Sequence, residues 1–492
     1  MAIGRVLLPC LVALAAGACG GGHDPATATT RAPSPTTTSA ASATHAQSSS
    51  SLRDWPLFGL RNSRENATNA STGISAGDLA SLHRTQIRLP GTVDSSPIVL
   101  GSTAFVTTTY GRTLAIDLAR DRVRWTFTPS GYRSWAGTAQ ITNASPAADP
   151  SRRYVYAASP NGLIHKLRVR DGREVGGRWP VRITRDATHE KLTSSLNISG
   201  AQLIATTGGY IGDAPPYQGH VVTISRATGR ILAVFNSLCS NRHAIIQPSS
   251  CGASASAIWA RSGAVVVPGS GDLLVATGNA PFDGRTNWGD SVLRLSADAR
   301  RLLGNWTPRD QAQLNVADID LGSTAPALLG GGLALQGGKA AKLDLLEIAR
   351  LNGTGTAGSR LGGELQELGA PGGQGVFSAP AVWHGGSGTI AFVTTGGGTA
   401  AYRLADRRLQ EVWSNGQAGT SPVVAGGLLY VYDPGGALRV YEPTTGRVLA
   451  KLDAGAGHWN SAVVVGGRIV LPEGNANDHS LSGVLDVWST SG

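Results

Sequence analysis

The chain has 492 residues, of which 66 are glycine and only 15% are charged, and its formal net charge is +10. This composition favours many short strands joined by tight turns and argues against long charged helices. The positive charge would suit an anionic partner. However, the arginines are scattered over turn-like positions and form no stripe interleaved with aromatic residues, so nucleic-acid binding is not expected.

The first 19 residues have the pattern of an export signal. Arg5 precedes an apolar run from Val6 to Ala16, and this run is too short to span a bilayer. The small residues before Cys19 and the glycines after it are similar to a bacterial lipobox, with Ala16 in place of the usual leucine. The pattern predicts a lipoprotein signal peptide over residues 1–19 and lipidation of Cys19, with a plain secretory signal as the alternative.

Residues 20–52 carry Thr, Ser, Ala and Pro with almost no large apolar side chains. Such a segment cannot bury enough surface to fold, so the composition predicts a disordered tether. Signal and tether together predict a protein of the cell envelope, outside the cytoplasm, that a lipid anchors to a membrane without a spanning segment. Secretion without an anchor is the alternative. We expect the chain to be a monomer.

From Asp54 onward the sequence repeats one pattern eight times. Each unit contains a Ser-Pro-like start, an alternating strand, a glycine turn, a second strand and a charged turn. The starts recur about every forty to fifty residues, the period of a propeller blade, as at Ser96, Ser145, Ser195, Ser421 and Ser461. Because each four-stranded unit buries its faces only against its neighbours, the array must close on itself. The pattern predicts an all-β fold, an eight-bladed propeller over residues 53–492.

Three details complete this prediction. The DWPLFG strand at residues 54–59 stands alone before the first unit and is suited to complete the last blade. The fifth unit is placed at residues 323–353. A tryptophan recurs at the same place in several units, where we expect it to pack one blade against the next, at Trp125, Trp179, Trp306 and Trp413.

Cys239 and Cys251 are the only cysteines beyond the predicted signal. Eleven residues lie between them, around a Pro-Ser-Ser turn. In an exported protein such a pair favours a disulfide, and this one would close a short loop beside the mouth of the propeller.

Polar residues that could take part in catalysis or metal binding occur in the stretch from Thr277 to Lys342. Asn279 follows the apolar strand DLLVAT, Asp318 and Asp320 stand just before another strand, and Lys339 lies in a Gly-Gly-Lys turn. Loops at equivalent places in successive blades open toward one axis, so we expect these four residues to converge. They would form an oxygen-rich metal site beside a fixed cation, as the metal-assisted oxidation of an alcohol requires. Asn and Asp near glycines also serve as simple turn residues, which is the alternative for each one alone.

The repeats, for example LAIDLARDRVRW and LRVYEPTTGRVL, resemble the pyrroloquinoline-quinone (PQQ) repeat of eight-bladed quinoprotein alcohol dehydrogenases. The order TGN, WGDS, TP-x-D and D-x-D is similar to the stretch that holds the metal ligands and the catalytic base in that family. The D-x-DLGS motif is most similar to the polyvinyl-alcohol dehydrogenase branch. The resemblance implies PQQ as a cofactor, together with Ca²⁺ or a lanthanide.

The resemblance also implies roles for individual residues. Asn279 would bind the metal, and Asp318 would be the base that removes the alcohol proton. Asp320 is similar to the additional carboxylate of the lanthanide-using members. Lys339 falls where the family places an Arg or Lys that bonds the quinone carbonyls. Trp259 lies near the position of the tryptophan on which the quinone ring stacks.

The sequence departs from the family pattern in several respects. Asp213, in GGYIGDAPPYQGH, is near but not at the place of the family's metal-binding glutamate. The adjacent cysteine pair that faces the quinone in many members is absent, and the loop from Asp310 to Asp318 is longer. Non-catalytic propellers share the repeat. Two functions therefore remain open: an exported dehydrogenase of an alcohol or sugar, and a scaffold lipoprotein that binds an envelope protein or glycan through its mouth loops.

Overall fold

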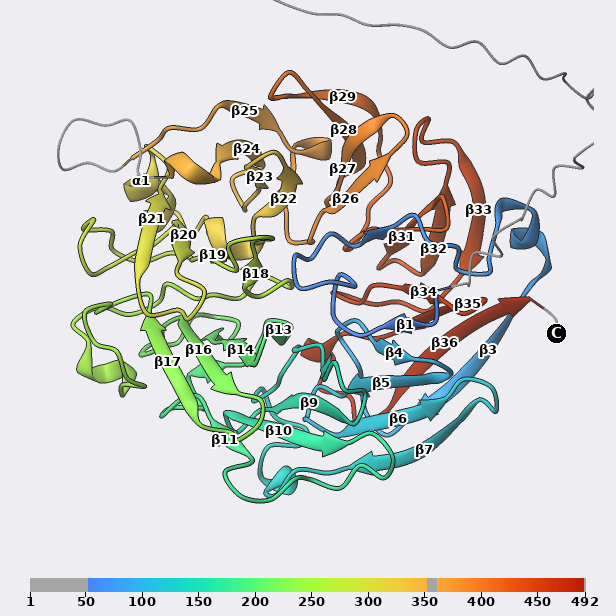
Figure 1. The fold of residues 1–492 in the computed structure, drawn as a ribbon, viewed down its shortest axis with the longest axis horizontal. Coiled ribbons are helices and arrows are strands. Elements are labelled where there is room, and N and C mark those ends of the chain that lie inside the picture. Colours follow the sequence, from blue (N-terminus) through green and yellow to red (C-terminus); the bar gives the residue numbers. More distant parts are fainter. Residues whose placement is uncertain (1–51, 352–360, 491–492) are drawn as a thin grey trace, which may run out of the picture. The chain divides into compact units, whose positions relative to one another are not determined.

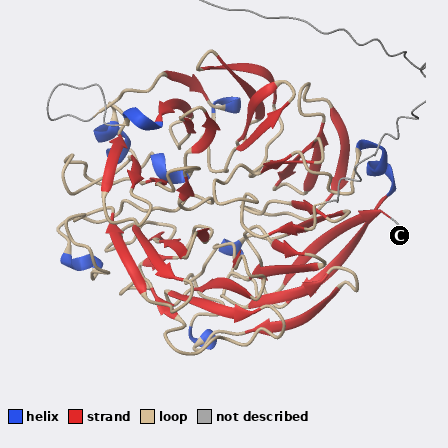
Figure 2. Ribbon diagram, in the orientation of Figure 1, coloured by secondary structure: helices blue, strands red, loops and turns tan. Residues whose placement is uncertain are grey.

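The structure is a computed structural model, and it describes residues 52–351 and 361–490. The predicted signal, the lipidation site Cys19 and the tether up to residue 51 lie outside the described residues. Strands dominate the described ranges, and the one α-helix there, α1 (Gln311–Val316), is a short piece of a connection (Figure 2). None of the described helices has the length and apolar character needed to cross a membrane.

The strands form eight four-stranded antiparallel blades, in agreement with the predicted fold class (Figure 1). Blade 1 contains β4 (Ile98–Leu100), β5 (Thr103–Thr107), β6 (Thr113–Asp117) and β7 (Arg122–Phe127). Blade 2 contains β8 (Ala147–Ala148), β9 (Tyr154–Ser159), β10 (Leu163–Arg168) and β11 (Val181–Arg182). Blade 3 contains β13 (Asn197–Ser199), β14 (Gln202–Thr206), β16 (His220–Ser225) and β17 (Ile231–Asn236). Blade 4 contains β18 (Val265–Val266), β19 (Leu273–Ala276), β20 (Val292–Leu295) and β21 (Leu302–Trp306).

The remaining blades follow in the same order along the chain. Blade 5 contains β22 (Ala327–Gly330), β23 (Leu333–Gln336), β24 (Lys342–Glu347) and β25 (Gln366–Gly369). Blade 6 contains β26 (Ala381–Gly385), β27 (Gly388–Thr394), β28 (Thr399–Ala405) and β29 (Arg408–Asn415). Blade 7 contains β30 (Val423–Ala425), β31 (Leu428–Asp433), β32 (Ala437–Tyr441) and β33 (Val448–Asp453). Blade 8 contains β34 (Val463–Val465), β35 (Arg468–Pro472), β36 (Gly483–Thr490) and one strand from the N-terminal part of the chain, β3 (Leu82–Leu89).

The N-terminal strand that completes blade 8 is β3, and not the DWPLFG segment. β3 pairs with β36 along its whole length, from Leu82 opposite Thr490 to Leu89 opposite Gly483 (Figure 1). In DWPLFG only β1 (Asp54–Trp55) pairs, and it pairs with β4 of blade 1, while β2 (Ala67–Thr68) runs parallel to β30 of blade 7. The proline after Trp55 has no amide hydrogen for a ladder, whereas LHRTQIRL offers eight uninterrupted positions.

Burial within a blade depends on the position of the strand. All residues of the inner strands β5 and β6 are buried, because each of their faces packs against a neighbouring blade. The outermost strand β7 alternates between exposed and partly buried residues. The alternation expected from the sequence is therefore a property of the outer strands. The predicted fifth unit, which ends at residue 353, is too short. Its fourth strand, β25, lies beyond that residue and has a weakly apolar sequence that gives no clear strand pattern.

The recurring tryptophans pack between blades, as predicted. Trp125 of blade 1 donates its Nε1 hydrogen to the Val169 carbonyl of blade 2 at 2.9 Å. The turn glycines of the following blades, Gly172 and Gly446, approach the rings of Trp125 and Trp413 so closely that a Cβ would lie 2.5 Å from a ring carbon. Both glycines have a positive φ, +70° and +69°, which other residues adopt only with strain.

Candidate functional site

A cavity of about 580 Å³ lies where loops of several blades meet. Blades 2, 3, 4, 5, 6 and 8 contribute its lining. The lining residues belong to connections that enter the first strand of a blade or to loops between the second and third strands. In an antiparallel blade these two kinds of loop lie at the same end, so the topology alone brings residues distant in sequence to one cavity.

The structure brings together the four polar residues that the sequence singled out, hereafter the carboxylate cluster (Asn279, Asp318, Asp320 and Lys339). Asn279 donates its backbone hydrogen to Asp320 Oδ1 at 2.8 Å and its Nδ2 hydrogen to Asp318 Oδ1 at 2.6 Å. Lys339 Nζ lies 2.5 Å from Asp320 Oδ2 and 3.7 Å from Asp318 Oδ1. It also donates to the Asp318 carbonyl at 3.3 Å. The ammonium thus bridges the two carboxylates.

Local backbone geometry explains why these residues meet. Gly278, after β19, leaves room for Asp320, because a Cβ at this glycine would lie 2.1 Å from Asp320 Oδ1. Asp318 adopts a positive φ of 56° where the chain leaves α1, a conformation that Asp tolerates better than most residues. The backbone of Lys339 donates to the Asp320 carbonyl at 2.9 Å, which fixes the Gly-Gly-Lys turn beside the pair.

Burial and charge act in opposite directions on this cluster. Asp320 is only 8% exposed, and burial raises its pKa above the usual value although Lys339 opposes the shift. For Lys339, burial lowers the pKa, but the charge of Asp320 and the hydrogen bond to it outweigh burial and raise the pKa overall. The side chain of Asp318 is 68% exposed and faces the cavity. The cluster therefore combines one buried, paired carboxylate with one that a ligand can reach.

The donor atoms of the cluster suit a hard cation, but they are too few to hold one alone. Asn279 Oδ1 is buried and has no hydrogen-bond partner within the described residues. Carboxylate and amide oxygens are the usual ligands of Ca²⁺ and similar ions. Nevertheless, residues 52–351 and 361–490 contain no group of three or more His, Cys, Asp or Glu that could hold a metal. A cation here would need further oxygen ligands from a bound molecule.

Two other predicted residues lie at the cavity but outside the cluster. Asp213 lines the cavity, and its Oδ1 accepts a hydrogen bond from the Tyr217 hydroxyl at 2.7 Å. No hydrogen bond or ion pair within the described residues joins Asp213 to the cluster. The Trp259 ring faces the cavity with its centroid 5.8 Å from Lys339 Nζ and 6.1 Å from that of Phe377. Trp459 continues this aromatic wall, 5.4 Å from Phe377.

A further acid at the cavity, Asp94, was not predicted from the sequence. Asp94 is 1% exposed, and its oxygens accept from Asn143 Nδ2 at 2.9 Å and from Trp459 N at 2.7 Å. His458 Nδ1 lies 2.8 Å from the same carboxylate. Burial acts to raise the pKa of Asp94, but the hydrogen bond and charge of His458, together with the charge of Arg261 and the Ala476 amide, outweigh it, so the pKa lies below its usual value. Asp94 therefore joins blades 1, 2 and 8 around the cavity.

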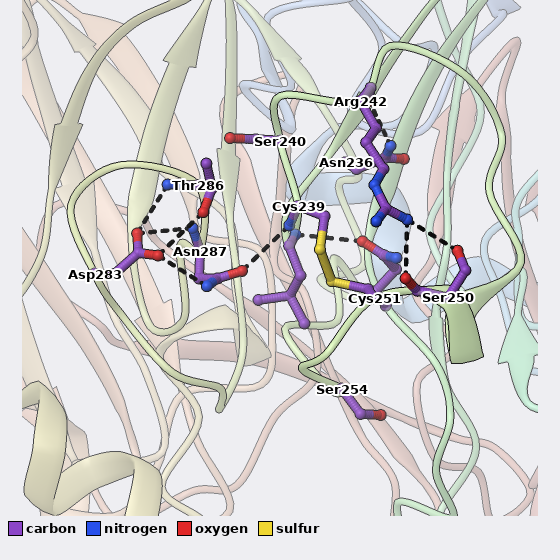
Figure 3. The surroundings of a disulfide bond; sticks show 12 residues. Asn236, Cys239, Ser240, Arg242, Ser250, Cys251, Ser254, Asp283, Thr286 and Asn287 are labelled. Atoms are coloured by element: carbon purple, nitrogen blue, oxygen red, sulfur yellow. Dashed lines mark hydrogen bonds between the residues drawn. A yellow bond between two sulfur atoms is a disulfide. The ribbon is translucent and has the colours of Figure 1, made fainter.

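The predicted disulfide is present. Cys239 and Cys251 are bonded with a Cα–Cα distance of 6.1 Å, and Figure 3 shows the bond within its loop. Cys239 N donates to Asn287 Oδ1 at 3.2 Å. Cys251 belongs to a small apolar cluster with Ala280, the residue that follows Asn279 in the chain. The disulfide loop is thus packed against the segment that carries one member of the carboxylate cluster.

Comparison with known proteins establishes the fold. No protein-family model matches the chain, and no curated protein matches it in sequence. Among solved structures, quinohemoprotein alcohol dehydrogenase from Comamonas testosteroni is similar with a TM-score of 0.67 and 14% identity over 89% of this chain and 81% of that one. A europium-containing methanol dehydrogenase has a TM-score of 0.63 and 14% identity over 89% and 98% of the two chains. BamB from Moraxella catarrhalis has a TM-score of 0.52 and 13% identity over 83% and 97%. At such identities these similarities establish a shared propeller fold.

Proposed function

We propose that this protein is a dehydrogenase that binds PQQ and a hard cation in the cavity and oxidises an alcohol or sugar there. The observation that supports the proposal is the convergence of Asn279, Asp318, Asp320 and Lys339 at a cavity lined by tryptophans. Asn279 Oδ1 is a buried amide oxygen beside these two carboxylates, and because it has no hydrogen-bond partner within the described residues it is available to a cation. The solved dehydrogenases with the same fold agree with this proposal. The finer likeness to the polyvinyl-alcohol branch stays a prediction.

The cavity residues fit such a cofactor. Asn279 and Asp320 would hold the cation, with Asp318 adjacent, and Trp259 would offer a flat apolar face to the quinone ring. A volume of about 580 Å³ is in the usual range for a ligand of this size. When bound, PQQ supplies a hydride acceptor whose carbonyl a coordinated cation makes more electrophilic. Lys339 would donate a hydrogen bond toward that carbonyl.

The remaining task of the chain is to remove the hydroxyl proton of the substrate, and Asp318 is placed for it. Asn279 Nδ2 holds Asp318 Oδ1 at 2.6 Å, whereas Oδ2 has no hydrogen-bond partner within the described residues. This free oxygen belongs to an exposed side chain that lines the cavity, within reach of a bound alcohol. A positioned carboxylate of this kind can accept the proton as the adjacent C–H bond breaks.

The test is a titration of the mature protein with PQQ in the presence of Ca²⁺ or a lanthanide, followed by tryptophan fluorescence and quinone absorbance. Asp318→Asn should keep cofactor binding but reduce turnover with an artificial electron acceptor by about 100-fold or more. Asp320→Ala should weaken cation binding first. The matched control is Asp310→Asn, a carboxylate at the start of α1 that lies 3.6 Å from Lys342 instead. Failure of PQQ to bind with either type of cation would reject the proposal.

A second candidate is a scaffold that binds an envelope protein or glycan through the same loops. One observation favours it, namely that no acidic cluster among the described residues could hold a metal by itself. Lys339 also neutralises the carboxylates directly, without any added cation. The propeller fold is compatible with this role. The titration separates the two candidates, since a scaffold would show no metal-dependent binding of the quinone.

A further inference from the structure

One wall of the cavity carries two buried cations. Lys191, in β12 (Glu190–Lys191), and Arg261, which precedes β18, are 8% and 6% exposed, and both face the cavity. Within the described residues Lys191 Nζ has no hydrogen-bond or ion-pair partner, and it lies 6.0 Å from the centroid of the Tyr210 ring. Arg261 Nη1 and Thr193 Oγ1 are buried and also lack hydrogen-bond partners there, although the Arg261 guanidinium lies 5.2 Å from the centroid of the Trp459 ring. We name Lys191, Arg261 and Thr193 the basic wall.

The nearby acids are engaged elsewhere. Asp94 acts on the charges of Lys191 and Arg261 from a distance, but its oxygens already accept from Asn143, His458 and backbone amides. Glu190 precedes Lys191 in the chain, yet its Oε1 accepts from His220 Nε2 at 2.9 Å and from a backbone amide, and its Oε2 accepts from a threonine hydroxyl. Neither carboxylate neutralises the basic wall by contact.

Such a wall is unfavourable without a ligand. Buried donors that lack acceptors cost free energy, and two unpaired cations on one surface repel each other. Burial, together with a smaller effect of the Arg261 charge, lowers the pKa of Lys191 to about 7, against a smaller opposing effect of Asp94. Burial likewise lowers the pKa of Arg261 to about 10. Tyr210, which also faces Lys191, stays a neutral phenol because burial raises its pKa. Near neutral pH a large share of the Lys191 amines is therefore uncharged when no anion is bound.

We propose that Lys191, Arg261 and Thr193 form a subsite for a carboxylate of the cavity ligand, and that Lys191 takes up a proton as this carboxylate enters. The proton comes from the solvent and converts the amine to an ammonium, while no covalent bond of the ligand changes. The inference rests on the proposed function for the identity of the ligand, since PQQ carries three carboxylates. An acidic group on the substrate would present the same chemistry.

The test measures the number of protons that the protein takes up when the ligand binds. Calorimetric titration of the mature protein with PQQ in two buffers of different ionisation enthalpy gives the number of protons taken up on binding. From a pKa of about 7 for Lys191, we expect uptake of about 0.5 proton at pH 7 and about 0.9 at pH 8. The affinity should fall by up to about tenfold per pH unit above pH 7, until the pKa of Lys191 in the complex is reached.

Two variants at this position separate charge from titration. Lys191→Arg keeps a permanent cation, so binding should persist while proton uptake and the pH dependence disappear. Lys191→Met removes the cation, so binding at pH 6 should weaken by about tenfold or more and proton uptake should be lost. Binding of PQQ by the wild-type protein without proton uptake would exclude a carboxylate of PQQ as the ligand of the subsite, and the same result with an acidic substrate would overturn the inference. Undiminished uptake in either variant would do the same.

A second titrant distinguishes this inference from the proposed function. Benzene-1,2,4-tricarboxylate carries carboxylates on a flat ring but no quinone. If it binds with proton uptake while PQQ does not bind, the subsite stands and the quinone assignment fails. If PQQ binds without uptake, the quinone assignment stands and the subsite fails, unless glycerate then binds the PQQ-loaded protein with uptake, which would assign the carboxylate to the substrate. If neither compound binds, both proposals are rejected.

Discussion

Replacement of Asp290 by asparagine tests how the structure supports the loop that carries Asp318 and Asp320. Asp290 is fully buried behind this loop, where its Oδ1 accepts from Leu321 N at 3.1 Å and its Oδ2 lies 3.4 Å from Gln311 Nε2. Burial raises the pKa of Asp290 to about 8, against the opposing hydrogen bond from Leu321. The folded chain therefore holds a proton on Asp290 at neutral pH, whereas the unfolded chain releases it above about pH 4.

The sign of the effect follows from this difference in bound protons. The contribution of Asp290 to stability is complete below about pH 4 and is lost as the pH rises toward about 8, at about 1.4 kcal/mol per pH unit. At pH 7 the loss amounts to about 4 kcal/mol, an upper estimate. Asparagine keeps an acceptor for Leu321 N and does not titrate. Its one lost contact, with Gln311, costs about 1 kcal/mol. We therefore expect Asp290→Asn to gain stability relative to the wild type as the pH increases.

Urea denaturation of the mature chain between pH 5 and pH 8, followed by tryptophan fluorescence, measures this difference. Asp344 in β24 provides an independent case, because burial raises its pKa to about 7. Asp344→Asn should follow the same slope and level off about one pH unit earlier. Parallel pH profiles for the wild type and Asp290→Asn would refute the conclusion that Asp290 is protonated in the folded chain.

Three further predictions concern the disulfide, a blade contact and the membrane anchor. Cys239→Ser should lower the free energy of unfolding by about 3 kcal/mol, because the bond closes a short loop; a variant as stable as the oxidised wild type in urea would contradict this. Gly172→Ala should lower the thermal midpoint, since a Cβ would collide with the Trp125 ring, whereas Gly176→Ala, with nothing within 4 Å, should not. Mass spectrometry of the protein from its native host should find an acylated Cys19 at the N-terminus, and another first residue or an unmodified thiol would reject the anchor.

The propeller could be predicted from the sequence because each blade repeats the same pattern of strands and turns. The strand that closes the ring could not be predicted. Several segments before blade 1 have strand character, and all of them pair somewhere: β1 with blade 1, β2 with blade 7 and β3 with blade 8. Which segment closes the ring depends on which one can reach the free edge of β36 in three dimensions, and β3 pairs with that edge at eight positions. That edge does not exist until the blades are assembled.

The carboxylate cluster could be recognised because its residues fall within about sixty positions, in chemically distinctive surroundings. The basic wall could not, because an isolated Lys or Arg in a repeat has no local sign that its surroundings are buried. The repeat nevertheless offered one indication of which residues lie at the cavity. The residues two positions before the start serines of four units line or support the cavity, and they are Asp94, Asn143, Thr193 and Trp459.

The carboxylate cluster and the basic wall place different demands on a ligand of the cavity, and these demands decide what can occupy it. The carboxylate cluster offers oxygen atoms that suit a cation, including the unpaired Oδ1 of Asn279. The basic wall offers Lys191 and Arg261, which need an anion. The hydroxyls of a neutral alcohol or sugar can form hydrogen bonds with these atoms, but they bring neither a cation for the cluster nor a negative charge for the basic wall. A molecule that carries both carboxylates and cation-coordinating oxygens meets both. This is the physical reason for proposing that a cofactor occupies the cavity alongside the substrate.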